Sequence, residues 1–199
     1  MKKMAKLLAV LLVLMLGMST VASAGIMMPN VYVEDIKLSL YVPPYLTILT
    51  RDQMDDSLLA VLGMDRAAAV DYMVANQLYV DAFPSDVSYE LTVAMQPLPG
   101  LGSFRDYGDA MLELLCDQVV VEYEKIGMTV TATDIYKNDE ADFVKIYYND
   151  PSSGARVVQY YTVVNDQAVH FRLFNYSGAI TEADETILKS VVDNADFDS

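Results

Sequence analysis

His170 is the residue best suited to acid–base chemistry, because it is the only histidine in this chain of 199 residues. An imidazole titrates near neutral pH and often serves as a general base. A hydrolase built on His170 would need a serine, Cys116 or a carboxylate beside it. The sequence has no G-x-S-x-G, H-E-x-x-H or C-x-x-C motif and no glycine-rich phosphate loop after a strand. We therefore predict a structural histidine and no catalytic residues.

Cys116 is the only cysteine, so no intrachain disulfide can form. It could act as a nucleophile, yet it follows Met111–Leu115 within a helical apolar pattern. Free cysteines in such positions pack as small apolar residues. We predict a buried and unreactive thiol.

Clusters of acidic side chains offer the oxygen ligands that Ca²⁺ prefers. The candidate metal site is the alternating set Asp193, Asp196 and Asp198, which lacks the glycine and the closing glutamate of an EF-hand loop. The alternative for these residues is a solvated helix end. Two further clusters share this composition: Asp52, Asp55 and Asp56, and Asp139, Glu140 and Asp142. The sequence indicates no other cofactor.

Tyrosine is abundant, with 14 residues and no tryptophan. Adjacent tyrosines on a strand point to opposite faces of the sheet, so one ring of each pair can be core and the other exposed. Tyrosine also suits interfaces. The candidate binding surface comprises Tyr147, Tyr160, His170 and Arg172, with His170 and Arg172 expected on one strand face.

The first 24 residues have the pattern of a secretory signal peptide. Lys2, Lys3 and Lys6 precede an apolar run from Leu7 to Leu16, and Ala22-Ser23-Ala24 gives a small-residue cleavage site. The run is shorter than the roughly 20 residues that cross a bilayer. Gly25 stands where a lipoprotein would need cysteine. We predict a secreted protein with signal peptide 1–24, a short lead 25–35 and one domain over 36–199.

The chain is strongly acidic, with a formal net charge of −15. Loss of residues 1–24 would remove three lysines and no acidic residue, which leaves a formal charge of −18. Such a surface repels nucleic acid and anionic membranes. We therefore expect neither nucleic acid as a partner nor membrane insertion after signal cleavage.

Periodicity predicts a mixed chain of helices and strands. Ser103 is placed to cap a long helix over 104–126, Asp65 and Gly63 bound two shorter helices within 54–77, and Thr181 opens a terminal helix. The predicted strands cover residues 36–42, 45–50, 78–83, 87–95, 129–136, 143–148, 156–164 and 168–174. In the strand 156–164 both faces carry apolar residues, so both must be covered. This favours an α+β fold: an antiparallel sheet flanked by helices on both faces.

The order of elements resembles the PsbP-like superfamily, which includes exported bacterial DcrB-like domains. The resemblance rests on Leu38–Pro43, the long mid-chain helix, the strands with Tyr160-Tyr161, and Ile187–Val191 before Phe197. The tryptophan usual after the proline of the first strand is missing, and Tyr45 lies there. The resemblance implies an α-β-α sandwich used for binding and assembly, with no shared catalytic residues.

These observations predict a secreted, non-catalytic binding or accessory protein. It would act through an acidic, tyrosine-bearing surface on an extracellular or envelope protein. The alternative is a domain that binds Ca²⁺ or a small ligand, and a hydrolase is the third hypothesis.

Overall fold

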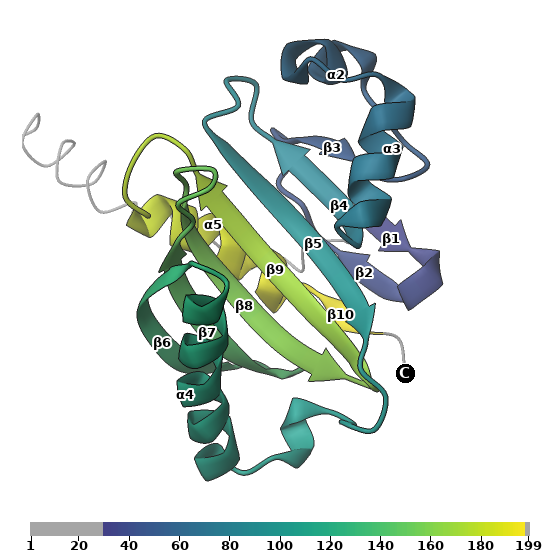
Figure 1. The fold of residues 1–199 in the computed structure, drawn as a ribbon. Coiled ribbons are helices and arrows are strands. Elements are labelled where there is room, and N and C mark those ends of the chain that lie inside the picture. Colours follow the sequence, from purple (N-terminus) through teal and green to yellow (C-terminus); the bar gives the residue numbers. More distant parts are fainter. Residues whose placement is uncertain (1–29, 198–199) are drawn as a thin grey trace, which may run out of the picture.

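A seven-stranded antiparallel sheet forms the centre of the molecule, with strand order β3-β4-β5-β9-β8-β7-β6 (Figure 1). The computed structural model describes residues 30–197. The strands are β3 (Thr47–Leu49), β4 (Leu78–Phe83), β5 (Tyr89–Pro97), β6 (Thr129–Lys137), β7 (Asp142–Asn149), β8 (Arg156–Val164) and β9 (Gln167–Asn175). Turns such as Asn165-Asp166, both with positive φ, join neighbouring strands as hairpins. The predicted α+β fold is confirmed.

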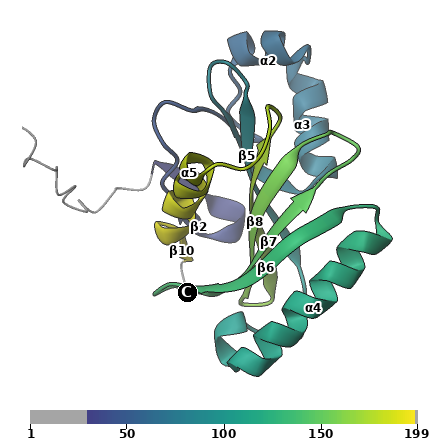
Figure 2. The same ribbon diagram turned by 90° about the vertical axis from the view of Figure 1, so that its left-hand side faces the viewer.

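Helix α5 (Glu182–Asp193) covers one face of this sheet together with a small sheet of order β1-β2-β10 (Figure 2). The strands of the small sheet are β1 (Val31–Val33), β2 (Leu38–Leu40) and β10 (Asp196–Phe197). Thr181 and Asp184 form a capping box at the start of α5, as the sequence predicted. Leu188, Val191 and Val192 on its inner side are fully buried.

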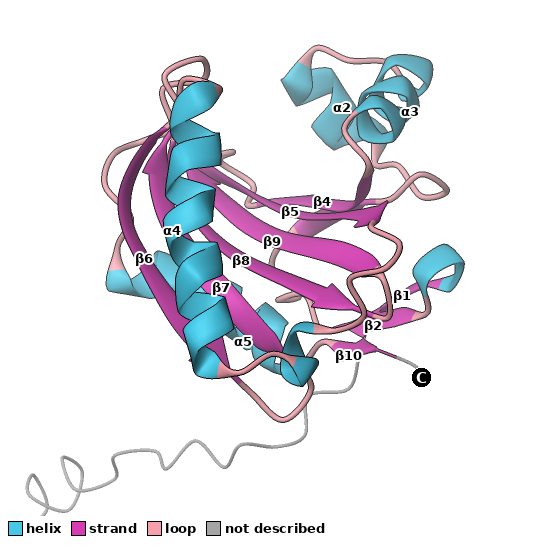
Figure 3. Ribbon diagram, turned by 60° about the horizontal axis from the view of Figure 1, so that its bottom comes forward, coloured by secondary structure: helices cyan, strands magenta, loops and turns pink. Residues whose placement is uncertain are grey.

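Three helices cover the other face in two separate groups, which Figure 3 shows standing apart over the sheet. They are α2 (Asp56–Leu62), α3 (Arg66–Ala75) and α4 (Asp109–Lys125). Helices α2 and α3 pack over β3 to β5, and α4 packs over β6 to β8. Asp65 caps α3, and Gly63 ends α2 with a φ of 68°, as predicted. The covering of both sheet faces is therefore confirmed.

The predicted helix over 104–126 is wrong at its start. Residues Phe104–Asp106 form one turn of 3₁₀ helix, Tyr107 is extended, and α4 begins only after Gly108. Phe104 is 2% exposed and lies 5.3 Å from the Tyr161 ring, so burial of this side chain fixes the turn apart from α4. The Ser103 hydroxyl accepts a hydrogen bond from the backbone of Asn165 at 3.0 Å instead of capping α4.

The structure also places regular elements within the predicted lead of residues 25–35. Strand β1 pairs antiparallel with β2, with Val31 opposite Leu40. Asn30 exchanges side-chain hydrogen bonds with the backbone of Val42 at 2.7 and 2.8 Å. The lead is therefore shorter than expected, because β1 completes an edge of the small sheet. The predicted signal peptide lies outside the described residues.

Candidate functional site

Four polar side chains form a row across the centre of the sheet, on the face that carries α3 and α4. Asp81 on β4 is opposite Thr92 on β5, and Thr92 is opposite Arg172 on β9. Arg172 is in turn opposite Gln159 on β8. Side chains that are directly opposite on neighbouring strands lie in contact range. The row therefore brings an acid, a hydroxyl, a guanidinium and an amide together.

Thr92 and Arg172, the two middle residues of this row, lie at the floor of a groove between α3 and α4, with a volume of about 470 Å³. This size is in the range of small-molecule sites. Aromatic side chains from several elements form much of its wall: Tyr72, Tyr123, Tyr148, Phe174 and Tyr176. The groove exists because α3 and α4 pack on different strands and leave the middle of the sheet uncovered by helix.

Arg172 is held at the floor by a network centred on Gln159. Its Nε donates to Gln159 Oε1 at 2.8 Å, and the Tyr123 hydroxyl donates to the same oxygen at 3.0 Å. The Gln159 amide nitrogen lies 3.3 Å from His170 Nδ1. Within residues 30–197, neither Nη atom of Arg172 has a hydrogen bond or a carboxylate within 4.0 Å. The guanidinium is thus oriented through one edge and free at the other.

Thr92 is 2% exposed, and its hydroxyl has no hydrogen-bond partner among the described residues. A buried polar group without a partner costs about 1–3 kcal/mol. Thr92 lines the groove directly opposite Arg172. The floor of the groove therefore presents both an unpaired hydroxyl and a free guanidinium edge.

Asp81 and Glu90 form a carboxyl pair beside this floor. Burial raises the pKa of Asp81 well above its ordinary value, and the charge of Glu90 and a hydrogen bond with it raise the pKa further. Burial also raises the pKa of Glu90, although hydrogen bonds from Tyr176 and Asp81 and the charge of Arg172 act against it. The surroundings therefore favour the protonated form of Asp81 more strongly than that of Glu90.

His170 stays neutral at physiological pH. Burial, together with a smaller effect of the positive charge of Arg172, lowers the pKa of its imidazole to about 3. The ring stacks on Tyr161, with centroids 4.8 Å apart. These contacts agree with the predicted structural histidine.

A second, apolar cavity of about 250 Å³ lies between the sheet and the helices α2 and α3. It shares Tyr72, Glu90 and Tyr176 with the groove as a common wall. Asp81 also lines this cavity, and its remaining wall is apolar: Leu49, Leu59, Leu62, Met64, Ala69, Met73, Phe83 and Val87. The polar groove and this apolar cavity are therefore neighbours on one face.

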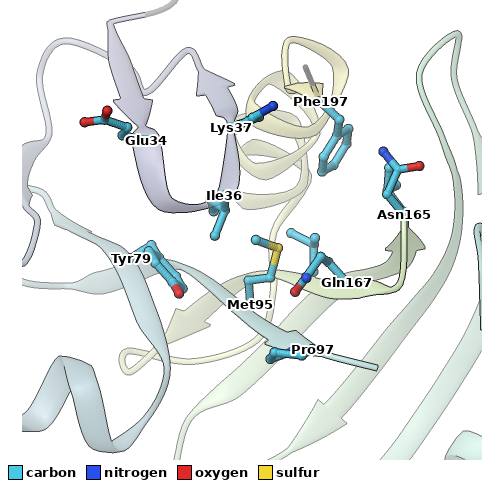
Figure 4. Close-up of a pocket in the computed structure, with 11 residues that line it drawn as sticks. Glu34, Ile36, Lys37, Tyr79, Met95, Pro97, Asn165, Gln167 and Phe197 are labelled. Carbon is cyan, nitrogen blue, oxygen red and sulfur yellow. The ribbon is translucent and has the colours of Figure 1, made fainter. Parts of the chain in front are cut away.

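A third cavity, of about 470 Å³, lies on the opposite face between the main sheet and the turn joining β1 to β2 (Figure 4). Ile36, Met95 and Phe197 contribute apolar surface to it, and Glu34 and Lys37 also line it. The two buried side-chain atoms without partners in residues 30–197, on Asp81 and Thr92, both lie on the other face. We therefore place the candidate site in the α3–α4 groove.

The structure divides the four residues of the predicted binding surface. His170 and Arg172 share the groove face, as expected, whereas Tyr147 and Tyr160 belong to the core on the α5 face. Tyr160 is 1% exposed. The four side chains do not form one surface. Successive residues of a strand point to opposite faces, and His170 is paired with Tyr161, so the neighbouring Tyr160 points to the other face.

The candidate Ca²⁺ ligands are engaged in other contacts where the structure describes them. Asp193 bonds with Lys189 and Tyr136, Asp196 is exposed on β10, and Asp198 lies outside the described residues. Between residues 30 and 197, no three His, Cys, Asp or Glu side chains converge on one point. In the other clusters, Asp55 caps α2, and Asp56 pairs with Arg66. The Ca²⁺ site at Asp193, Asp196 and Asp198 stays a prediction.

Cys116 is buried on the inner side of α4, as the sequence predicted, and burial raises the pKa of its thiol. Sequence reasoning missed Asp81, Glu90 and Thr92. The available indication was polarity within strands: Glu90 and Thr92 alternate with Leu91, Val93 and Met95. Charged residues at such positions are rarely buried without a partner.

The chain has the PsbP-like fold, as the resemblance implied. A similar solved structure is the solution structure of cyanobacterial PsbP (CyanoP) from Synechocystis sp. PCC 6803. The TM-score is 0.50 at 9% sequence identity, over 91% of this chain and 99% of that chain. This similarity establishes the fold alone. No family model matches the sequence, and no curated protein matches it.

Across the described part of the chain, no helix is both long enough and apolar enough to span a bilayer.

Proposed function

We propose that this protein is a secreted, non-catalytic binding protein that holds a small ligand in the α3–α4 groove. One observation carries the proposal: within residues 30–197 the buried Thr92 hydroxyl has no hydrogen-bond partner, and Thr92 lies opposite Arg172 on the floor of the groove. Binding sites commonly combine apolar walls with a few polar groups held at fixed positions. A ligand with a hydrogen-bonding or anionic group would satisfy both side chains.

The chemistry of the neighbouring groups supports binding over catalysis. His170 has a pKa of about 3, far from the value that suits a general base at neutral pH. Asp81 and Glu90 are both buried, and the Tyr176 hydroxyl donates to one Glu90 oxygen. Burial keeps the Cys116 thiol protonated. These groups position and neutralise one another.

A thermal-melt screen of soluble metabolites against residues 25–199 tests the proposal, since a ligand that binds only the folded state raises the melting temperature. Each compound is screened in parallel against Thr92→Val, which removes the hydroxyl and keeps the shape, and against Arg172→Gln. Compounds that stabilise the wild type and lose their effect in both variants support the groove as the site. Stabilisation that is identical in all three proteins contradicts it.

Secretion is part of the proposal and rests on the sequence of residues 1–24. Expression of the full chain in a bacterial host, followed by mass spectrometry of the extracytoplasmic fraction, tests it. We expect a chain beginning at Gly25. Recovery only of the uncleaved chain in the cytoplasm contradicts the secretory assignment.

The second candidate function is docking on an extracellular or envelope protein, favoured by an exposed apolar stripe on α4. Met111, Leu114 and Val121 are 49%, 59% and 49% exposed and lie along one side of the helix. Acidic residues such as Glu113 and Asp117 flank them. A partner suited to this stripe has an apolar groove rimmed by lysine or arginine.

In-cell photo-crosslinking tests this second function with a crosslinker at position 114 and, as a matched control, at the exposed Glu182 on α5. A specific adduct from position 114, which weakens at high salt and in Val121→Ser, supports docking. Equal labelling from both positions contradicts it.

A further inference from the structure

The groove combines positive and negative charge at its floor, and this feature narrows the class of ligand. We propose that it recognises an α-amino acid with an apolar side chain: the carboxylate at Arg172 and Thr92, the ammonium at Glu90, and the side chain toward the apolar cavity under α2 and α3. This inference rests on the proposed ligand-binding function and names its ligand class.

The carboxylate has a defined place between Arg172 and Thr92. Arginine binds carboxylates through parallel N–H groups, and both Nη atoms of Arg172 lack partners in the described residues. Gln159 fixes the guanidinium plane through Nε. The Thr92 hydroxyl, opposite Arg172, can donate to the same carboxylate and would no longer be unpaired.

The charges around the groove disfavour an anion without a cationic group. Glu90 lines the groove, and the hydrogen bond from Tyr176 and the charge of Arg172 favour its ionised form. Asp150, also on the groove wall, is ionised: although burial acts to raise its pKa, hydrogen bonds from Ser152 and Ser153 bring it below the ordinary value. Arg172 contributes the one positive side chain on the wall. A zwitterion has a cationic group for the acidic side chains and an anionic group for Arg172, so it matches the groove better than a simple carboxylate does.

The ammonium has a matching acceptor at the correct spacing. Thr92 is opposite Arg172, and Glu90, two residues before Thr92, is opposite Phe174. Glu90 is therefore a diagonal neighbour of Arg172, and such side chains have backbones about 7 Å apart. That gap suits a carboxylate and an ammonium on one carbon. Tyr72 and Tyr176 line the groove beside Glu90, and tyrosine rings also attract ammonium groups.

The apolar side chain has a place next to the ammonium. Glu90, Tyr72 and Tyr176 belong both to the groove and to the apolar cavity of about 250 Å³. A side chain directed past them meets Leu59, Met73 and other apolar groups. Methionine adapts its shape to a ligand more readily than branched residues.

A set of matched ligands tests each arm by NMR titration of the ¹⁵N-labelled protein at neutral pH. L-Leucine carries all three groups, 4-methylpentanoate lacks the ammonium, 3-methylbutylamine lacks the carboxylate, and glycine lacks the side chain. A tenfold change in affinity corresponds to about 1.4 kcal/mol. Loss of a hydrogen bond to a charged group, or of the burial of the leucine side chain in the case of glycine, exceeds this amount, so we expect each analogue to bind at least about tenfold more weakly than leucine. The shifted amides should be those of β5, β9 and α3.

Two variants assign the charged groups. Arg172→Gln should abolish the preference for leucine over 3-methylbutylamine, and Glu90→Gln should abolish the preference for leucine over 4-methylpentanoate. Arg156→Gln and Glu113→Gln, at exposed positions outside the groove, are the matched controls and should keep both preferences. Ratios of affinities within one variant remain informative even when a substitution changes stability.

The outcomes separate the two proposals. If 4-methylpentanoate or 3-methylbutylamine binds as tightly as leucine, or if leucine does not bind while another metabolite shifts the groove amides, the amino-acid inference is overturned and the ligand-binding function stands. If no compound of the screen shifts the groove amides, both proposals fail.

Discussion

The face of the sheet under α5 and the face under α3 and α4 bury their side chains in different ways. Under α5, Phe143, Phe171 and Tyr160 make edge-to-face contacts, and Leu188 and Val191 close over them without exposure. This core is continuous with the small sheet. On the other face, apolar clusters under α2–α3 and under α4 are separate, and the polar row lies between them.

This difference indicates a division of roles within one sheet. Fully burying one large aliphatic side chain contributes about 1.5–3 kcal/mol, so the α5 face supplies much of the stability. The other face carries a carboxyl pair and an unpaired hydroxyl, each of which costs stability. Local costs of this kind concentrate at functional sites. The predictions below test whether stability and ligand binding separate between the two faces.

The largest expected effect comes from Leu188→Ala on the α5 face. Leu188 is fully buried, so the cavity and the lost transfer energy should reduce the free energy of unfolding by about 2–5 kcal/mol. Urea denaturation measures this change. Arg172→Gln, the matched substitution in the groove, should change the unfolding free energy by less than about 1 kcal/mol. If both variants lost the same unfolding free energy, the proposed difference in role between the two faces would be wrong.

His170 should make the groove face sensitive to acid. The folded-state pKa is about 3, against an unfolded value near 6.5, so the unfolded chain binds the proton first and stability falls as the pH drops from about 6.5 towards 3. His170→Gln removes this dependence. Between pH 7 and pH 4 the wild type should lose roughly 1–3 kcal/mol more than the variant, a range reduced for partial exposure of the ring. Urea denaturation at both pH values gives the change in unfolding free energy. An equal change in the wild type and in the variant would contradict this role.

Asp81 should act in the opposite direction. Its pKa is raised in the folded state, so the folded protein retains a proton that the unfolded chain releases above about pH 4. This contribution lowers stability as the pH rises. Asp81→Asn keeps a hydrogen-bond donor for Glu90 and does not ionise, so it should raise stability at pH 7 by on the order of 1 kcal/mol. Thermal melts should show the gain vanish near pH 4, and a gain that persists there would have another cause.

The smallest effect is expected for the ion pair on the α5 face. Lys145 Nζ lies 2.8 Å from Glu185 Oε2, and the Lys145 side chain is 14% exposed. Burial lowers the lysine pKa, but the hydrogen bonds to Glu185 and Tyr147 outweigh it and raise the pKa. Lys145→Met should cost below about 1 kcal/mol, because its apolar stem still packs and the pair is partly solvated. Leucine binding should not change, and a loss of binding in this variant would show that the faces are coupled.

Local sequence patterns were sufficient for most elements. The two short helices, their caps at Asp65 and Gly63, and the capping box at Thr181 depend on interactions within a few residues. The apolar residues on both faces of β8 correctly predicted that both sheet faces are covered. The start of α4 failed because burial of Phe104 against Tyr161, far along the chain, overrides local helix propensity.

The site was predicted only in part, since His170 and Arg172 were chosen together with Tyr147 and Tyr160. The pairing of β7, β8 and β9 places Arg172 in line with Gln159 and Ile146, so Tyr147 points to the opposite face of the sheet. The sequence does not give this pairing. Acidic residues on β4 and β5 gave no motif, because a carboxyl pair formed across strands has no fixed spacing in sequence.

The sequence by itself determined the strand and helix content, the acidic surface and the burial of Cys116, because these follow from composition and short-range periodicity. The tertiary structure alone decided that Asp81, Thr92, Arg172 and Gln159 lie in one row. It also decided that α3 and α4 stand apart and leave Thr92 and Arg172 at the floor of a groove. Strand register and helix placement join residues up to 91 positions apart, and no local pattern encodes such contacts.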